Sequence, residues 1–124
     1  MIKMYIKPTC STCRTAVQLA KACDASVEMV EYLIDTPSEK ELLELTQQLG
    51  VKLFDLVRTK ESLYKEKYEG KKISDKQWLK ILHKNPILIE RPIITDGTHA
   101  VIGRPPTLIV DFLNQKQKTK KKSK

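Results

Sequence analysis

The strongest constraint in this sequence is a pair of cysteines between a short apolar run and a helical pattern. Cys10 and Cys13 follow the apolar stretch 1–6 and precede the helical pattern 14–23. A helix that begins at Cys10 directs backbone N–H groups and its positive dipole end toward that sulfur, which favours the thiolate. The thiolate is the form of cysteine that attacks sulfur or a substrate atom. Cys13 lies one turn further along, close enough for a disulfide, so the pair is interpreted as a nucleophile and a resolving thiol.

Length and composition limit the class of protein. A chain of 124 residues suits one domain that buries a core without disulfides. It contains no apolar run near the roughly 20 residues that span a membrane, and we expect no secretory leader, since Met1 leads directly into a strand pattern. Three closely spaced cysteines do not make a secreted disulfide framework. We therefore expect a monomeric, cytoplasmic protein without a membrane partner.

The net charge of +8 comes mostly from one end of the chain. Of the 23 lysines and arginines, six lie in residues 114–124, which contain none of the 15 acidic residues. We predict that this Lys-rich tail is disordered and solubilising. Contact with nucleic acid or an acidic partner is the less favoured alternative, so no direct nucleic-acid binding is expected.

A metal site is not predicted for this chain. Structural zinc takes four ligands. Apart from the cysteine pair, the remaining candidate zinc ligands do not lie in closely spaced pairs along the sequence. They are Cys23, His83 and His99. Cys23 is interpreted as a small apolar core residue, His83 as a residue that interacts with a helix end, and His99 as an exposed hairpin residue.

Apolar periodicity predicts four strands and several helices. The strands are expected at 2–6, 27–33, 91–95 and 100–102, and the helices at 11–23, 36–49, 53–57, 74–84 and 108–113. The charged stretch 61–72 is expected to form an exposed helix and a loop. The order is β-α-β, a helical insertion at about 36–90, and β-β-α. This order predicts a single α/β domain over 1–113 with a mixed four-stranded sheet.

Local signals mark the ends of these elements. Thr36 is expected to cap the first inserted helix, with Glu39 closing a capping box, and Gly50 is expected to end that helix. A second capping box is expected at 74–77, and the Asp-Gly pair at 96–97 is a hairpin signal. Trp78 is expected in the core of the insertion.

This order of elements, with Cys-x-x-Cys at the first helix, is similar to the thioredoxin-like (glutaredoxin-like) fold. Three more stretches resemble the arsenate reductase (ArsC)/Spx family, and the ArsC branch more closely: Pro86-Ile-Leu-Ile-Glu-Arg-Pro-Ile-Ile94, Leu56-Val57-Arg58 and Ile102-Gly103-Arg104-Pro105. The resemblance extends over residues 2–113.

The resemblance implies an enzyme of the arsenate reductase type. In that family the cysteine at the helix start, Cys10 here, attacks arsenate, and three arginines hold the oxyanion: Arg58, Arg91 and Arg104. Arginine suits this role because its planar fork binds an oxyanion through two nitrogens. The family's proline after the second arginine, Pro92 here, is typically cis and faces the cysteine loop.

Two positions depart from the ArsC pattern. ArsC enzymes carry a histidine four residues before the nucleophile, where this chain has Ile6, and they usually lack a cysteine at the position of Cys13. Lys7 is a candidate replacement for the missing positive charge. We expect Cys13 to close a disulfide with Cys10, which thioredoxin or glutathione with glutaredoxin then reduces. No bound cofactor is expected.

Two other functions are consistent with the sequence. Spx proteins share the Cys-x-x-Cys and bind the C-terminal domain of the RNA polymerase α subunit, in part through a glycine that matches Gly50. The alternative is therefore a redox-sensing transcription regulator with RNA polymerase as its partner. Arg104 favours the ArsC branch, because Spx-like chains lack that arginine. A general disulfide reductase is the third possibility.

Overall fold

The structure, a computed structural model, describes residues 2–23 and 26–122. The chain forms two compact units. The first contains Met1–Glu31 and Arg91–Lys124, and the second contains Tyr32–Glu90. The second unit includes the helical insertion expected at about 36–90. That residues 1–113 act as a single domain stays a prediction.

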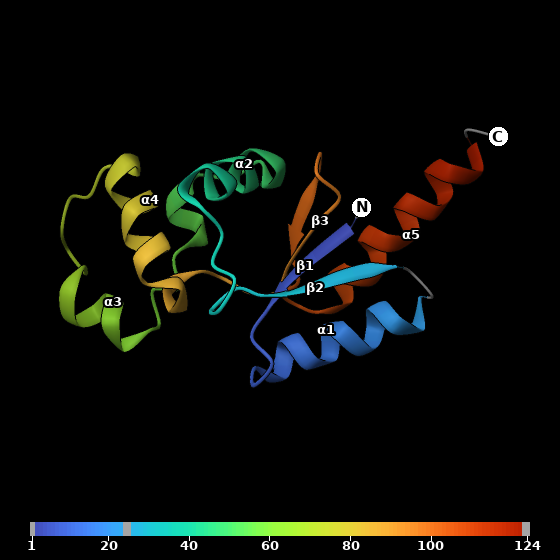
Figure 1. Cartoon of the computed structure of the whole chain (residues 1–124), viewed down its shortest axis with the longest axis horizontal. Helices are drawn as coiled ribbons and strands as arrows, with labels where there is room; N and C mark the ends of the chain where they lie inside the picture. Colours follow the sequence, from blue (N-terminus) through green and yellow to red (C-terminus); the bar gives the residue numbers. More distant parts are fainter. Residues whose placement is uncertain (1, 24–25, 123–124) are drawn as a thin grey trace. The chain divides into compact units, whose positions relative to one another are not determined.

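The first unit is built on a four-stranded mixed sheet, as expected (Figure 1). The strands are β1 (Ile2–Ile6), β2 (Val27–Glu31), β3 (Ile93–Thr95) and β4 (Ala100–Ile102). They lie in the order β2-β1-β3-β4, with β2 parallel to β1 and both β3 pairings antiparallel. A parallel neighbour needs a crossover, and helix α1 (Ser11–Ala22) supplies it.

Alternation along β1 decides which side chains enter the core of the first unit. Met4 and Ile6 point to the same face, and Met4 is paired with Ile94 of β3. Helices α1 and α5 (Thr107–Lys122) cover this face, because their buried residues join one apolar cluster with the sheet. The cluster consists of Met4, Ile6, Cys13, Ala16, Ala20, Ile94, Ile109 and Leu113. Cys13 is thus a core residue as well as a candidate for chemistry.

Helix α5 extends beyond its expected end. The sequence predicts a helix over 108–113 followed by a disordered tail over 114–124, whereas α5 continues to Lys122. Lysine and glutamine have high helix propensity, which accounts for the continuation. Residues 123 and 124 lie outside the described residues, and disorder there stays a prediction.

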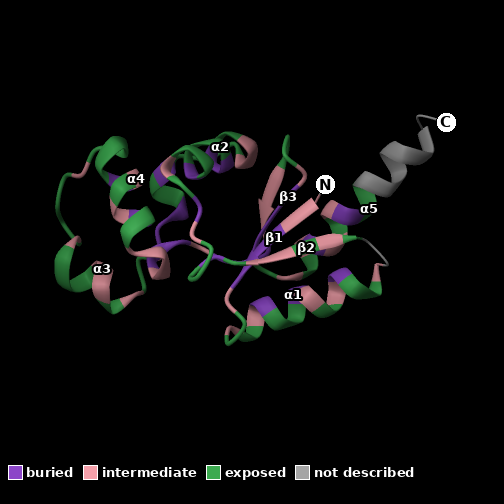
Figure 2. Cartoon of the chain, viewed as in Figure 1, coloured by how far each residue is buried: buried purple, intermediate pink, exposed green. Residues whose placement is uncertain are grey.

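The second unit is helical. It contains α2 (Glu39–Leu49), α3 (Ser62–Lys67), α4 (Asp75–Lys84) and two short 3-10 turns, Leu53–Leu56 and Pro86–Leu88. Trp78 of α4 is 4% exposed and contacts the rings of Phe54, Tyr64 and Tyr68, which confirms that it is core. Figure 2 colours the chain by burial, and α1 and α2 each show buried residues among exposed ones. Gly50 ends α2 with φ +69°, as expected.

The start of α2 differs from the expectation. Ser38, and not Thr36, is the N-cap, and its side chain closes a capping box with Glu41. Both pairs have the same three-residue spacing, but the later start places Glu39 and Glu41 in the first turn, where the helix dipole favours acidic side chains. The second expected capping box, Ser74 with Gln77 at the start of α4, is confirmed.

None of the helices in the described part of the chain is long and apolar enough to cross a membrane.

Candidate active site

The cysteine loop connects β1 to α1 and places Cys10 at the helix N-terminus. The Cys10 N–H donates to the Lys7 carbonyl at 2.9 Å, which closes the loop, and the Cys10 carbonyl accepts from the Arg14 N–H at 3.0 Å, which starts the helix. Cys10 has extended backbone angles and is the N-cap residue. It is partly exposed, whereas Cys13 is fully buried, and both are free thiols.

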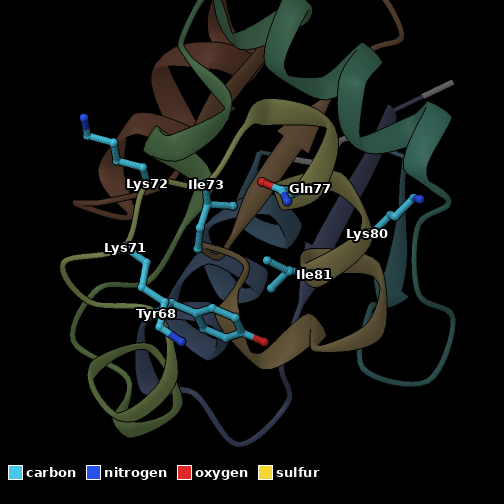
Figure 3. A pocket seen from close by; sticks show the side chains of 7 residues that line it. All are labelled: Tyr68, Lys71, Lys72, Ile73, Gln77, Lys80 and Ile81. Atoms are coloured by element: carbon cyan, nitrogen blue, oxygen red, sulfur yellow. The ribbon is translucent and has the colours of Figure 1, made fainter.

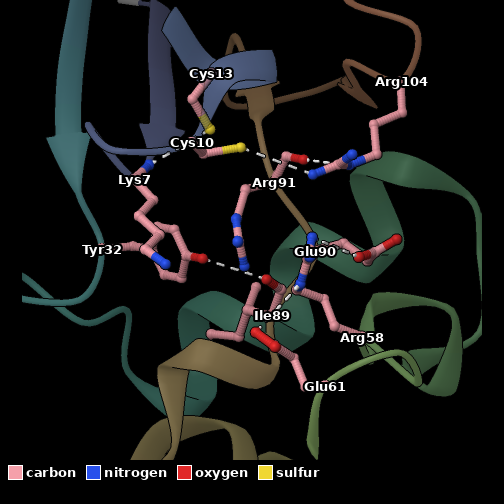
Figure 4. Close-up of polar contacts among 10 residues, drawn as sticks. All are labelled: Lys7, Cys10, Cys13, Tyr32, Arg58, Glu61, Ile89, Glu90, Arg91 and Arg104. Carbon is pink, nitrogen blue, oxygen red and sulfur yellow. Dashed lines mark hydrogen bonds and ion pairs between the residues drawn. The ribbon is translucent and has the colours of Figure 1, made fainter.

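Arg91 and Arg104 reach the cysteine loop from the β3–β4 hairpin. Arg91 precedes β3 and Arg104 follows β4, and antiparallel pairing of Ile93 with Ile102 brings both to the same end of the sheet. The Nε of Arg104 donates to the Arg91 carbonyl at 2.7 Å, and its Nη2 lies 3.9 Å from the Cys10 Sγ (Figure 4). Arg91 is 6% exposed, and its guanidinium also interacts with the Cys10 thiol.

These contacts shift the acidity of Cys10. Partial burial raises the pKa of the thiol, but the Cys13 backbone N–H and the Arg91 guanidinium outweigh it and lower the pKa from 9.0 to about 6. A thiol with this pKa is mostly thiolate at neutral pH. The loop therefore holds a thiolate at neutral pH without a separate base.

Cys13 has the opposite character. Burial raises the pKa of the Cys13 thiol to about 11, and the neighbouring Cys10 raises it as well. The Lys7 N–H, whose nitrogen lies 3.5 Å from the Cys13 Sγ, opposes this shift. At neutral pH the pair is therefore one thiolate, on Cys10, and one thiol, on Cys13.

The residues at 6 and 7 play parts that the sequence did not indicate. Ile6 is 8% exposed and belongs to the apolar cluster, so that position supplies packing and not a proton carrier. Lys7 was a candidate for replacing the charge of the missing histidine. In the structure, the backbone N–H of Lys7 donates to the Cys13 sulfur.

Pro92 is buried, and the Arg91–Pro92 peptide bond is cis, as the resemblance implied. Its carbonyl accepts from the Gly103 N–H at 2.8 Å, next to Arg104. That Pro92 faces the cysteine loop stays a prediction. A second cis bond, Arg104–Pro105, was not expected. No local signal separated this proline from an ordinary turn proline.

Arg58 belongs to the second unit, where two carboxylates flank it. Its backbone N–H donates to the Leu88 carbonyl at 2.7 Å, its Nη1 lies 3.4 Å from the Glu90 Oε1, and its Nε lies 3.9 Å from the Glu61 Oε1. Sequence reasoning missed both carboxylates. Glu61 lies three residues after Arg58, and this spacing could have indicated an ion pair. The role of Arg58 as an oxyanion ligand stays a prediction.

The remaining candidate residues have structural contacts. Cys23 packs at the edge of the apolar cluster, the His83 Nδ1 lies 3.0 Å from the Pro37 carbonyl oxygen, and His99 is exposed. Among residues 2–23 and 26–122, no group of three or more His, Cys, Asp or Glu is arranged to hold a metal ion.

The second unit also has an open cleft of about 460 Å³ (Figure 3). Its lining residues are Tyr68, Lys71, Lys72, Ile73, Gln77, Lys80 and Ile81. None of them is a predicted site residue, and they offer neither a thiol nor a carboxylate.

The acidity of Cys10 predicts a specific pH dependence. Because a pKa of about 6 leaves the thiolate dominant above that value, alkylation of Cys10 by iodoacetamide should rise about tenfold from pH 5 to pH 7 and then level off. The rate at each pH is measured by mass spectrometry of the peptide that contains Cys10. A midpoint near 8.5, the value of an ordinary cysteine, would contradict the contribution of Arg91 and the helix.

Comparisons with known proteins identify similar sequences and structures. A sequence model described as the ArsC family matches residues 5–112. A Streptomyces viridochromogenes protein described as an uncharacterized protein in the glnII region is 40% identical over 120 residues, which cover 92% of this chain and 100% of the relative. An arsenate reductase from Acidiphilium multivorum is 30% identical over 118 residues, with coverage of 94% and 84%.

A solved structure of an arsenate reductase from Vibrio cholerae superposes with a TM-score of 0.84 at 35% identity, and covers 89% of this chain and 95% of its own. The expected thioredoxin-like fold is confirmed by this likeness and by the observed sheet order.

Proposed function

This chain belongs to the ArsC family and is an oxidoreductase of the arsenate reductase type; on that premise we propose that it reduces arsenate or a similar oxyanion, with Cys10 as the nucleophile and Cys13 as the resolving thiol. The observation that carries the proposal is the position of Cys10. It begins helix α1, its pKa is lowered to about 6, and Arg91 and Arg104 both reach its sulfur.

The first step is attack of the Cys10 thiolate on the central atom of the oxyanion. A sulfur–arsenic bond forms, and one oxygen leaves as water after protonation. Arg91 and Arg104 hold the remaining oxygens, because guanidinium forks neutralise the charge and fix the geometry of a tetrahedral anion. Arg58 is the third oxyanion ligand by family resemblance.

The second step is attack of Cys13 on the Cys10 sulfur. A disulfide forms, the sulfur–arsenic bond breaks, and its electron pair stays on arsenic. Overall, one arsenate and two thiols give one arsenite, one disulfide and one water. Thioredoxin, or glutathione with glutaredoxin, supplies the two electrons that restore the thiols, so the proposal includes no bound cofactor.

Arsenate-dependent oxidation of NADPH tests this proposal. The chain is coupled in parallel to thioredoxin with its reductase and to glutathione with glutaredoxin, with the Cys10→Ser variant as the blank. We expect turnover in at least one arm and none in the blank, because serine does not form the thiolate. The active arm identifies the electron donor.

Absence of turnover in both arms, with ready formation of the Cys10–Cys13 disulfide, would contradict the reductase proposal. The comparisons give no support to RNA polymerase as a partner. If neither arm shows turnover, the next test is binding to the isolated C-terminal domain of the polymerase α subunit. Capture of this domain by the oxidised but not the reduced chain would favour the function of a redox-sensing regulator. A cytoplasmic location and a monomeric state remain predictions.

A further inference from the structure

We propose that Glu90 competes with the oxyanion for the guanidinium of Arg58, and so sets how tightly the chain holds its substrate. An oxyanion that binds Arg58 would take the place of the Glu90 carboxylate on that side chain. The inference rests on the role of Arg58 as an oxyanion ligand in the function proposed above. It concerns binding of the anion, and it needs no chemical step at Cys10.

The backbone of the second unit places Arg58 and Glu90 beside each other. Val57 and Ile89 form an isolated antiparallel bridge. The N–H groups of Arg58 and Glu90 each donate to a carbonyl of the opposite segment at 2.7 Å. Residues on either side of such a bridge are diagonal neighbours on one face, within reach of long side chains. The pairing of these two segments therefore holds the two side chains together.

Two carboxylates face the single guanidinium of Arg58 (Figure 4). The Arg58 Nη1 lies 3.4 Å from the Glu90 Oε1, and the Arg58 Nε lies 3.9 Å from the Glu61 Oε1. The side chains of Arg58, Glu90 and Glu61 are 17%, 26% and 25% exposed, so salt and water screen their charges only in part. An anion that approaches Arg58 therefore meets two negative charges for one positive charge.

Both ion pairs leave Arg58 with unused binding capacity. A strong hydrogen bond between a guanidinium and a carboxylate has about 2.8 Å between nitrogen and oxygen, whereas Glu90 contacts Arg58 at 3.4 Å through one oxygen. Among the described residues, the buried Nε of Arg58 has no hydrogen-bond partner. A tetrahedral oxyanion that bound the fork through two oxygens would make shorter bonds than Glu90 does. Glu90 is therefore a competitor that an oxyanion can displace.

The test follows the Arg58 side chain directly by NMR. The chain has four arginines, at positions 14, 58, 91 and 104, and their Nε–H signals are assigned by single replacements with lysine. Inorganic phosphate is the probe, because it has the tetrahedral shape and the charge of arsenate but does not oxidise thiols. Its dissociation constant is taken from the shift of the Arg58 Nε–H signal as phosphate is added at constant ionic strength.

Three variants separate the effect of Glu90 from that of net charge. Glu90→Gln removes the carboxylate charge, keeps the size of the side chain and leaves the backbone bonds across the bridge in place. Glu44→Gln is the matched control, because Glu44 is exposed on α2 and the change in net charge is the same. Glu61→Gln removes the carboxylate that lies further from the guanidinium.

We expect Glu90→Gln to bind phosphate about tenfold more tightly than the unchanged chain, in keeping with the net contribution of a charged hydrogen bond. Glu61→Gln should give a smaller gain, and Glu44→Gln a change of less than about twofold, because exposed charges are well screened.

Equal dissociation constants for Glu90→Gln and Glu44→Gln would overturn the proposal. Weaker binding in Glu90→Gln would also overturn it, because Glu90 would then hold Arg58 in place for the anion. An Arg58 signal that phosphate moves in none of the proteins would show that no oxyanion reaches this side chain, with the same consequence. Phosphate binding needs no turnover, so a failure of the reductase proposal is recognised separately in the NADPH assay.

Discussion

Replacing Arg91 by lysine is expected to lower kcat/KM for the oxyanion by about 100-fold, the usual effect of losing one oxyanion donor in a water-excluded site. Arg91 is 6% exposed and interacts with the Cys10 thiol. Lysine keeps the positive charge but has a single nitrogen. It therefore lacks the planar fork with which arginine can bind a thiolate and an oxyanion oxygen together. The measurement is the coupled NADPH assay across oxyanion concentrations.

Arg14→Lys is the matched control for this variant. Arg14 follows Cys13 on α1 but is exposed, so the same chemical change there should alter kcat/KM less than twofold. A second readout is the pH profile of Cys10 alkylation, whose midpoint should rise in Arg91→Lys and stay near 6 in Arg14→Lys. Equal activity of the two variants, with both folded by circular dichroism, would remove Arg91 from the site.

Gly103→Ala is expected to destabilise the chain by about 1–3 kcal/mol, the usual cost of overpacking a core. A Cβ on Gly103 would lie 2.8 Å from the Cδ1 and 2.9 Å from the Cγ1 of Ile109, and 3.0 Å from the Cγ of Pro92. Ile109 and Pro92 are fully buried, so neither can move away without disturbing its neighbours. The free energy of unfolding in urea measures the effect.

Ile109→Val tests the cause of that destabilisation. Valine lacks the Cδ1 that lies closest to the new methyl group, so the double variant should lose less stability than the sum of the single variants. Simple additivity would show that the contact with Ile109 is not responsible.

Features set by neighbouring residues were predictable from the sequence. The strand at Ile2–Ile6 and the αL ending at Gly50 were identified correctly. The capping box at Ser74 was identified as well, because its groups lie within three residues of each other. The same rule failed at Thr36, because Ser38 satisfied it equally and the first-turn charges favoured the later start.

Contacts between residues far apart in the chain were beyond the sequence. Arg58 was expected as an oxyanion ligand, and the structure places Glu90, 32 residues away in the chain, and Glu61 beside it. The contact between Arg104 and Cys10 joins residues 94 apart. Family resemblance selected the three arginines as candidates, but no local rule gave the distance from Arg104 to Cys10 or from Arg58 to Glu90.

The sequence by itself determined that a cysteine would begin a helix directly after a buried strand, because periodicity and the Cys-x-x-Cys spacing are local. Only the tertiary structure decided how far the two thiols would differ in acidity. Hairpin pairing brings Arg91 and Arg104 to Cys10, while packing against the sheet buries Cys13. The pKa of a thiol depends on the charges and water around it, and in this chain those surroundings come from segments that meet only on folding.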